Sequence, residues 1–340
     1  MENKEKMLRI VCGDVTFGVH GDGFSYIFSY ACGGPESLVT AGEEWLYRAP
    51  RPTFWRALTD NDRGSGFAYK SGMWLAADLF LRCTDSRVRI DGGAWTKMAA
   101  PANNRCGEND TAGEAEIAFV YETITIPAAT VEVTYRVNGE GQIRVDVRYC
   151  GREGLPELPV FGMRFVMPSK ACGYRYEGLS GETYPDRMAG GVPGVYEVAG
   201  LPVTGYLVPQ DCGVHMDTKW LEVYRDTKAS GRNTGDGTRS GTCGLRFGAD
   251  GQPFAFSCLP YTAEELENAT HIEELPAARR TVVSILGAVR GVGGINSWGA
   301  DVEDAYRIDG GKDIRYSFVI ERGVLSCRTA GGGEEADPKK

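Results

Sequence analysis

Two carboxylates two positions apart, Asp60 and Asp62, are the first side chains in this sequence that could do chemistry. Carboxylates at this spacing can exchange protons with a substrate or bind a hard cation. Asn61 lies between them, and Arg56 and Arg63 flank the group. Because a nearby cation favours the ionised form of a carboxyl group, neither acid is suited to donate a proton. The cluster is therefore interpreted as a rigid turn.

A glycine-rich run at Gly291–Gly299 carries one tryptophan, Trp298, after the polar residues Asn296 and Ser297. The Lys-Ser/Thr pair of a phosphate-binding loop is missing from the run. A loop of this composition can project an aromatic ring against the C–H face of a sugar, while polar neighbours bond the hydroxyls. The alternative is a tryptophan buried in the core, and composition alone does not decide between the two.

A second polar turn contains Asp186 and Arg187, which follow Tyr184 and a proline. Arginine can bond a carboxylate through two nitrogens, so a salt-bridged loop or a subunit contact is expected here. His271 is one of only three histidines in the chain. Because a chain with so few histidines is not expected to build an acid–base or metal site from them, His271 is interpreted as a hydrogen-bonded structural residue.

The run Arg51–Gly64 combines aromatic, charged and turn-forming residues. Pro52 cannot donate to a strand ladder, and Thr, Asp and Asn prefer turns, so neither a simple strand nor a helix is expected here. Phe54 and Trp55 are expected to anchor the run against a core or against a partner chain. They are also candidate members of an exposed interface patch.

Glycines and aromatic residues alternate directly after the acidic cluster. This stretch begins with Gly64, Ser65, Gly66 and Phe67. Glycine frees the backbone and an aromatic ring can cover a ligand, so a mobile lid over the mouth of a sugar site is predicted.

The elements that must position these side chains are β-strands. Apolar residues alternate from Val131 to Val137 and again from Ile143 to Tyr149, and the polar Gly-containing break between them predicts a hairpin. Helical signals are few, the clearest being the capping-box pattern at Thr262–Glu265. Many strands without alternating helices predict an all-β fold, a large antiparallel sandwich.

Composition bounds the remaining possibilities. The chain has 340 residues and a formal net charge of −9, which argues against a nucleic-acid partner. Apolar runs long enough to cross a membrane are missing, and the charged N-terminus does not resemble a signal peptide, so a cytoplasmic protein is expected. Ten cysteines occur singly, which argues against a structural zinc site, and a metal site is not expected in this chain. One domain is predicted over residues 1–328, with a disordered tail at 329–340.

Four blocks, in order along the chain, resemble the C-terminal domain of family 2 β-galactosidases, which is a separate small chain in some of these enzymes. They are Arg51–Gly64, Tyr176–Arg187, Pro260–His271 and Gly291–Gly299. The first matches Arg-Pro-x-Phe-Trp-Arg-Ala-x-Thr-Asp-Asn-Asp-x-Gly, and the second keeps the Tyr-Pro-Asp-Arg tetrad. Thr183 replaces an asparagine of the family pattern, and Ile295-Asn296 replaces an Asp-Asp pair.

The resemblance implies a galactose mutarotase-like β-supersandwich that belongs to an oligomeric enzyme. In that family two glutamates of a separate (β/α)₈ barrel hydrolyse terminal β-D-galactosides, such as lactose, by a retaining mechanism. The resemblance therefore implies a large partner chain that holds the catalytic glutamates, Mg²⁺ and a monovalent cation. It implies that this chain contributes no catalytic residue or cofactor, is inactive alone and supplies Trp298 as a sugar platform.

Three alternatives remain open. The chain could be an excised domain of a single-chain enzyme, although Met1 favours a separate chain. A stand-alone carbohydrate-binding module would bind galactosides without a partner. A mutarotase-like aldose epimerase would need an acid–base pair, commonly His and Glu, in a cleft, and the histidines here do not lie in motifs that resemble that family.

Overall fold

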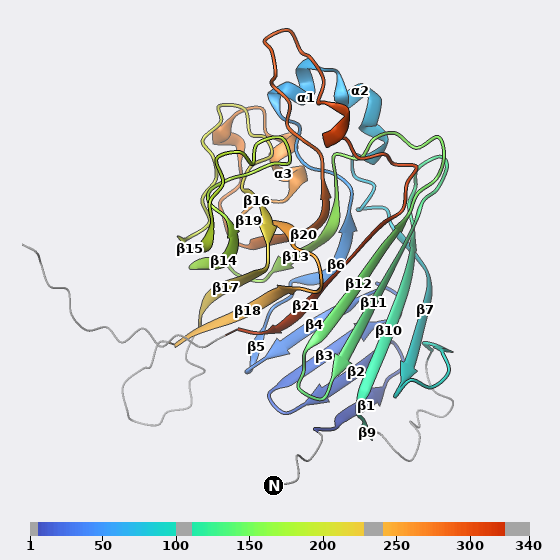
Figure 1. Cartoon of the computed structure of the whole chain (residues 1–340). Coiled ribbons are helices and arrows are strands. Elements are labelled where there is room, and N and C mark those ends of the chain that lie inside the picture. Colours follow the sequence, from blue (N-terminus) through green and yellow to red (C-terminus); the bar gives the residue numbers. More distant parts are fainter. Residues whose placement is uncertain (1–5, 100–110, 228–240, 324–340) are drawn as a thin grey trace, which may run out of the picture.

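The computed structural model describes residues 6–99, 111–227 and 241–323, and the tail predicted at 329–340 lies outside these ranges. Within them the strands form three antiparallel sheets of six, ten and five strands (Figure 1). The ten-stranded sheet is the centre of the molecule, and the two shorter sheets pack against it. The predicted all-β antiparallel supersandwich is confirmed.

The six-stranded sheet is built from the N-terminal strands and has the order β5-β4-β3-β2-β1-β9. Its strands are β1 (Leu8–Cys12), β2 (Thr16–Gly21), β3 (Phe24–Ser29), β4 (Pro35–Thr40), β5 (Glu43–Glu44) and β9 (Thr111–Ala112). Phe28 of this sheet packs on Phe119 and Tyr135 of the ten-stranded sheet, with ring centroids 6.5 and 5.6 Å away. These contacts form the lower sandwich in Figure 1.

The ten-stranded sheet has the order β15-β14-β17-β18-β21-β12-β11-β10-β7-β8. Its strands are β7 (Arg82–Ile90), β8 (Thr96–Lys97), β10 (Glu114–Glu122), β11 (Thr130–Asn138), β12 (Ile143–Cys150), β14 (Gly173–Leu179), β15 (Pro193–Ala199), β17 (Trp220–Thr227), β18 (Gly241–Ala249) and β21 (Ile314–Arg322). The β11–β12 pair is the predicted hairpin: Val137 lies opposite Ile143, and the alternate apolar residues face the core.

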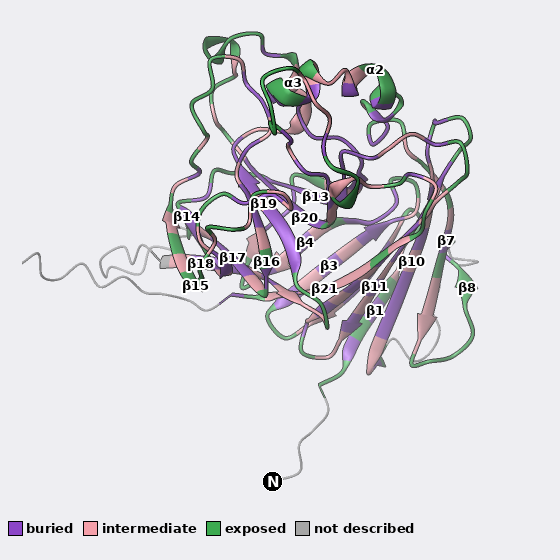
Figure 2. Ribbon diagram, turned by 45° about the horizontal axis from the view of Figure 1, so that its top comes forward, coloured by how far each residue is buried: buried purple, intermediate pink, exposed green. Residues whose placement is uncertain are grey.

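The five-stranded sheet has the order β16-β19-β20-β13-β6. Its strands are β6 (Arg48–Thr53), β13 (Val160–Met167), β16 (Val214–Thr218), β19 (Phe254–Leu259) and β20 (Thr281–Val289). It packs on the other half of the ten-stranded sheet, where Phe165 contacts Phe247 and Phe318 at centroid distances of 5.2 and 6.1 Å. Strand β13 is buried along its whole length (Figure 2), because it lies inside this second sandwich.

Two expectations for the run Arg51–Gly64 are wrong. Pro52 lies in strand β6 opposite Met163, which is possible because β6 is the last strand of its sheet and proline is tolerated at an edge. Asp60–Gly64 forms the single-turn helix α1, which begins at a capping box between Thr59 and Asp62. The reciprocal bonds of a capping box satisfy amide groups at a helix start, so this polar cluster stabilises a helical turn.

The remaining helical elements are short. They are α2 (Phe67–Ser71), η1 (Gly72–Trp74), α3 (Ala263–Asn268), η3 (Ile272–Glu274) and η4 (Asp304–Tyr306). Helix α3 begins at Thr262 with the predicted capping box to Glu265. Helices α1 and α2 lie at one end of the molecule, beside the loop that follows β20 (Figure 1).

Candidate functional site

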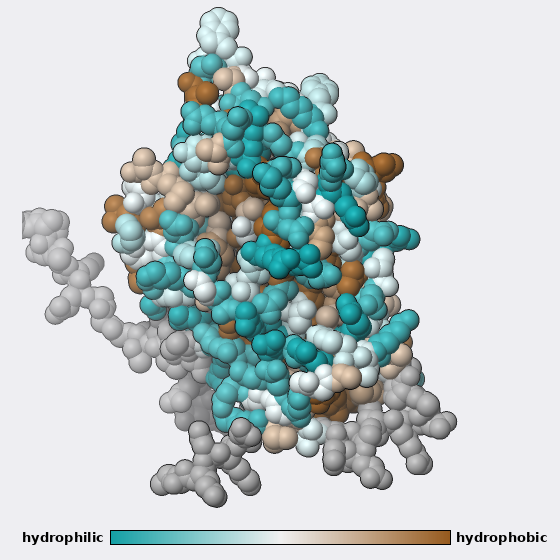
Figure 3. Space-filling view, turned by 45° about the vertical axis from the view of Figure 1, so that its right-hand side comes forward, coloured by the Kyte–Doolittle hydropathy of each residue, from teal (hydrophilic) through white to brown (hydrophobic). Residues whose placement is uncertain are grey.

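Residues from three of the four sequence blocks meet at one end of the molecule, around the loop between Arg290 and Asp301. This segment, called here the Trp298 loop, projects above helices α1 and α2 as the orange-red loop at the top of Figure 1. Figure 3 shows the same end as a narrow projection above the body. Because its two ends are anchored in the fold and its tip is exposed, the loop can present side chains to another molecule.

Trp298 is 93 % exposed, which rules out a core position for its ring in this chain. By contrast, Trp45, Trp55 and Trp74 are almost completely buried. Exposing the apolar surface of an indole to water is unfavourable in free energy, and a ligand or a partner that covers the ring would remove this cost. Of the two interpretations of Trp298, the exposed platform fits this geometry.

Asn296 shapes the tip of the loop. Its Oδ1 atom accepts hydrogen bonds from the backbone N–H of Trp298 at 2.9 Å and of Ala300 at 3.2 Å. An asparagine that bonds the backbone two residues on forms an Asx turn, and this fixes the backbone from which the indole projects. Ser297 is exposed beside it. Contact of Asn296 and Ser297 with a sugar stays a prediction.

The Tyr-Pro-Asp-Arg turn holds the first part of the loop. The Asp186 carboxylate accepts hydrogen bonds from the backbone N–H groups of Val292 at 3.0 Å and Gly293 at 2.7 Å. Arg187 donates to the Gly293 carbonyl oxygen. Tyr184 is buried and donates its hydroxyl to Asp211 at 2.8 Å. The adjacent Asp and Arg therefore organise a loop, with an ion pair of 3.9 Å between them.

Helix α1 holds the loop from the other side. Asn61 donates its Nδ2 amide to the Val292 carbonyl oxygen at 2.9 Å. The backbones of Gly64 and Gly299 touch, since a Cβ atom added to Gly299 would lie 2.6 Å from the Gly64 oxygen. Gly299 also has a φ of +77°, a conformation that side chains with a Cβ rarely adopt. Glycine is therefore required at position 299 for two independent reasons.

A buried group of charges lies under the loop. The Asp62 side chain is 1 % exposed and forms ion pairs with Arg56 and Arg290, each with a nitrogen–oxygen distance of 3.2 Å. Arg56 also donates to the Gly291 carbonyl oxygen at 3.0 Å. The Asp62 carboxylate also accepts a hydrogen bond from the Thr59 amide, so it is bonded by two guanidinium groups and one backbone N–H. The interpretation of Asp62 as a structural rather than a proton-donating acid agrees with these contacts.

Two acids of this group have shifted pKa values. Burial raises the pKa of Asp211 to about 6, although Arg56 and the Tyr184 hydroxyl act in the opposite direction. Partial burial acts to raise the pKa of Asp301, but hydrogen bonds from Lys70, the Val302 amide and Arg290 outweigh it and lower the pKa to about 2. Asp301 therefore stays ionised at any physiological pH.

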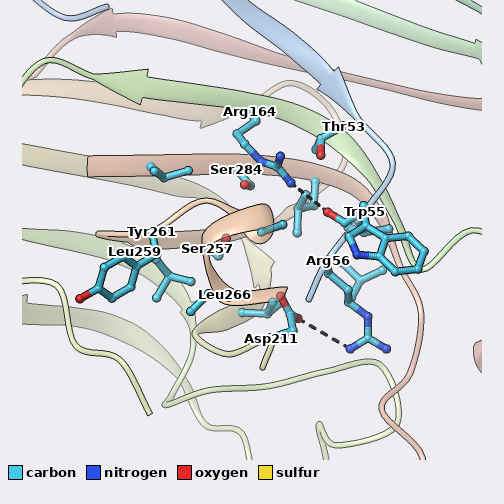
Figure 4. A pocket seen from close by; sticks show the side chains of 16 residues that line it. Thr53, Trp55, Arg56, Arg164, Asp211, Ser257, Leu259, Tyr261, Leu266 and Ser284 are labelled. Carbon is cyan, nitrogen blue, oxygen red and sulfur yellow. Dashed lines mark hydrogen bonds and ion pairs between the residues drawn. The ribbon is translucent and has the colours of Figure 1, made fainter. Parts of the chain in front are cut away.

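Phe54 and Trp55 are core residues, so their place in an exposed interface patch is wrong. Phe54 stacks on Trp74 with ring centroids 5.4 Å apart. The Trp55 carbonyl oxygen accepts a hydrogen bond from Arg164 at 2.8 Å. The cavity beside Trp55 in Figure 4 has a volume of about 30 Å³, and the ion pair between Arg56 and Asp211 lies at its edge. A space of this size holds water and not a sugar ring.

The predicted lid stretch is helical and partly buried. Phe67 of α2 lies under the Arg290 guanidinium, 4.1 Å from its carbon to the ring centroid, and is fully buried. Gly66 adopts a φ of +72° before α2, and Ser65 donates to the Asp62 carbonyl oxygen at 3.2 Å. Movement of this segment over a ligand stays a prediction.

His271 lies before η3, away from the Trp298 loop in the sequence. Its side chain is 63 % exposed and lies 3.2 Å from the Thr270 hydroxyl and 3.5 Å from a Glu274 oxygen. These local hydrogen bonds fit a structural residue. In the same block, Glu267 of α3 accepts from the Leu58 amide at 2.7 Å and thereby ties α3 to the run before α1.

The sequence did not single out Arg290, Asp301, Lys70, Asp211 or Glu267. One signal was present in the sequence, since an arginine stands between an apolar strand-like run and a glycine-rich loop, and an aspartate follows that loop. Across the described ranges, groups of three or more His, Cys, Asp or Glu side chains placed to hold a metal ion are absent. None of the described helices is long and apolar enough to cross a membrane.

Comparisons with known proteins agree with the sequence blocks. The family described as "Beta galactosidase small chain" matches residues 20–320. A "Beta-galactosidase small subunit" from Latilactobacillus sakei is 58 % identical and is matched over 94 % of this chain and 99 % of its own. A "Beta-galactosidase" from Streptococcus thermophilus is 32 % identical over 92 % of this chain, which spans only 28 % of that longer protein.

Solved structures that match this chain share little sequence with it. A structure described as a putative aldose 1-epimerase from Escherichia coli K12 covers 93 % of this chain with a TM-score of 0.43 and 9 % identity. The sequence matches are far stronger and span nearly the whole chain. The chain belongs to the β-galactosidase small-chain family, whose members correspond to the C-terminal part of longer β-galactosidases.

Proposed function

We propose that this chain assembles with a large β-galactosidase chain and completes its galactoside site with Trp298. The observation that carries the proposal is the indole, 93 % exposed at the tip of a loop that is anchored on several sides. Tryptophan is suited to this role because its face packs against the C–H groups of galactose. Asn296 and Ser297, beside it, are proposed to bond sugar hydroxyls.

The assembled enzyme would hydrolyse terminal β-D-galactosides such as lactose with retention of configuration. The two glutamates that this reaction needs, the Mg²⁺ and the monovalent cation belong in this proposal to the large chain. The longer relatives support the division, because the present chain matches only 28 % of the Streptococcus thermophilus protein and about as little of the Lactobacillus delbrueckii one. The chain is proposed to be inactive alone, and an epimerase is not favoured by these relatives.

Exposed apolar side chains near the Trp298 loop support assembly. Tyr69 and Met73 lie on α2 and η1, and Leu75, Leu79 and Phe80 follow them, all at least 43 % exposed. Lys70 of α2 bonds Asp301 at 2.8 Å, which places this segment beside the base of the loop. A segment that exposes several aromatic and aliphatic side chains is typical of a protein interface.

A cytoplasmic location belongs to the same proposal. Six cysteines of the described residues carry free thiols: Cys32, Cys83, Cys150, Cys212, Cys243 and Cys258. Free thiols persist in reducing compartments, whereas secreted proteins of comparable cysteine content are usually cross-linked.

The test is hydrolysis of nitrophenyl galactoside by the chain alone, by the large chain from the same source alone, and by their mixture. Activity in the mixture that greatly exceeds the sum of the two separate chains supports the proposal. Full activity of this chain alone contradicts it. Galactose binding by this chain together with an unstimulated large chain points to a binding module instead.

A control variant shows whether loss of an exposed tryptophan elsewhere on the surface also affects assembly. Trp95, 37 % exposed, lies between β7 and β8 and packs on Arg89. Trp95→Ala should leave both association and hydrolysis of the mixture unchanged. If it reduces association as strongly as a change on the α2–η1 face, such as Tyr69→Ala, the proposed face is wrong.

A further inference from the structure

We infer that Arg290 is a positioning residue for galactoside binding, because its guanidinium closes the Trp298 loop at its base and fixes where the indole stands. The inference rests on the proposed function of Trp298 and adds a residue to it. Arg290 is completely buried, so it touches no substrate and acts through the loop.

Each nitrogen of Arg290 meets a different carboxylate. Nη1 donates to Asp62 at 3.2 Å, Nη2 to Asp301 at 2.5 Å and Nε to Glu157 at 3.3 Å. The guanidinium plane also lies over the Phe67 ring. A guanidinium carries five N–H donors in fixed directions around a plane, which matches three acids spread around it, whereas an ammonium group is a compact point charge with three donors on one nitrogen. Arginine is therefore matched to this position.

The contact with Asp301 is the one that closes the loop. Arg290 ends the segment that leads into the loop and Asp301 begins the segment that leaves it, so their ion pair joins the two ends. The contact with Asp62 ties the same point to α1, and Lys70 of α2 ties Asp301 to the neighbouring helix. The loop base is thus fixed to both helices.

The tip has fewer restraints than the base. In the described segment 294–298, the side-chain hydrogen bonds are those that Asn296 accepts from the Trp298 and Ala300 amides of the loop itself. The side chains of Ile295 and Trp298 are both exposed at the tip. Since a loop tip follows the geometry of its ends, a displaced base would displace the indole, and misplacement of about 1 Å can cost roughly a hundredfold in rate.

The experiment is a double-mutant cycle in the assembled enzyme. Arg290→Lys keeps the positive charge but removes the planar guanidinium. Asp301→Asn removes the negative charge that pairs with Arg290 at the loop base. Each is combined with Trp298→Ala, and KM, kcat and inhibition by a thiogalactoside are measured. With Trp298 present, each change should weaken thiogalactoside binding and raise KM by about tenfold, and in the Trp298→Ala background it should have almost no further effect.

Arg164→Lys is the matched control. Arg164 is also buried and bonds two acids, Asp78 at 2.8 Å and Glu264 at 3.1 Å, but it does not contact the Trp298 loop. If this control also loses binding only when Trp298 is present, the effect is a general consequence of buried arginine loss and the inference is overturned. Equal effects of Arg290→Lys in both Trp298 backgrounds overturn it as well.

A readout without substrate separates the inference from the proposed function. In the isolated chain with isotope-labelled glycine, the amide resonances of Gly293, Gly294 and Gly299 should move in Arg290→Lys and Asp301→Asn and stay in place in Arg164→Lys. If Trp298→Ala does not affect binding, the proposed function of Trp298 fails, whatever these spectra show. If Trp298→Ala weakens binding but the glycine resonances stay in place in both base variants, Arg290 does not position the loop.

Discussion

Asp186 accepts a hydrogen bond from the backbone N–H of Gly293 at 2.7 Å, across more than a hundred residues of sequence. This bond joins the Tyr-Pro-Asp-Arg turn to the loop that carries Trp298. The same carboxylate accepts from the Val292 amide, so two neighbouring amides share one acid. A pair of amides held this way fixes the direction in which the loop leaves the body.

Asp186→Asn should destabilise the chain by roughly 1–3 kcal/mol, because the amide loses the negative charge that strengthens both bonds. Its NH₂ group would also stand where Oδ1 now accepts from the Val292 N–H. Asp91→Asn is the control. Asp91 is exposed and likewise accepts from two consecutive amides, those of Gly113 and Glu114, both at 2.8 Å. Urea unfolding should show a small loss for Asp91→Asn, and an equal loss for both variants would contradict the role assigned to Asp186.

Gly299→Ala should be more harmful than Gly181→Ala. Both glycines have positive φ angles, +77° and +69°, and both substitutions carry the cost of a left-handed backbone, about 1–2 kcal/mol. Only the Cβ at position 299 would also meet an atom, the Gly64 oxygen, whereas position 181 has nothing within 4 Å. Thermal unfolding and activity of the assembled enzyme measure the difference. Comparable losses would show that the approach of the two backbones is unimportant.

Asp211 should make the chain less stable as the pH rises. Its pKa is about 6 in the folded chain and 3.8 in its ordinary setting, so the folded state binds the proton more tightly. The stabilisation from the protonated form is complete below about pH 4 and is lost as the pH rises through about 6. Relative to Asp211→Asn, the free energy of unfolding should fall by roughly 1–3 kcal/mol across this window.

The control for this pH dependence has the opposite sign. Hydrogen bonds from Arg148, only partly opposed by desolvation, lower the pKa of Asp313 in the folded chain, so its stabilisation appears above its ordinary pKa and is lost as the pH falls. Relative to Asp313→Asn, the wild-type chain should therefore gain stability with rising pH. A pH-independent difference for Asp211→Asn would show that the Asp211 pKa is not raised.

Within the block Pro260–His271, the half-buried Glu267 should matter for stability and the histidine should not. Glu267→Ala leaves the Leu58 amide without its 2.7 Å partner and should cost roughly 1–3 kcal/mol. His271→Ala removes an exposed ring with local bonds and should change the free energy of unfolding by less than about 0.5 kcal/mol. A large loss for His271→Ala would mean that this histidine has a role beyond its local contacts.

Local pattern was enough to predict the β11–β12 hairpin. The apolar alternation in β11 and β12 and the turn between them lie within one stretch of sequence, so the hairpin could be predicted from it. The helical turn α1 could have been predicted as well, because Thr59 and Asp62 have capping-box spacing. Pro52 was misjudged because the position of β6 at a sheet edge depends on the whole topology.

The loop anchors could not be predicted in the same way. Arg290, Asp62 and Asp186 are brought together by the packing of three chain segments, and no sequence spacing specifies those distances. The exposure of Trp298 also depends on what the fold leaves uncovered. The proposed role of Trp298 comes from the family resemblance, whereas the buried charges that hold its loop were visible only in the structure.

The most direct test of the central claim compares Trp298→Ala and Trp298→Phe in the assembled enzyme, with binding of a thiogalactoside and the size of the assembly measured together. The account predicts that Trp298→Ala assembles normally but binds the galactoside about tenfold more weakly, and that Trp298→Phe keeps part of the affinity through its smaller ring. Unchanged galactoside binding by a fully assembled Trp298→Ala enzyme would contradict the account.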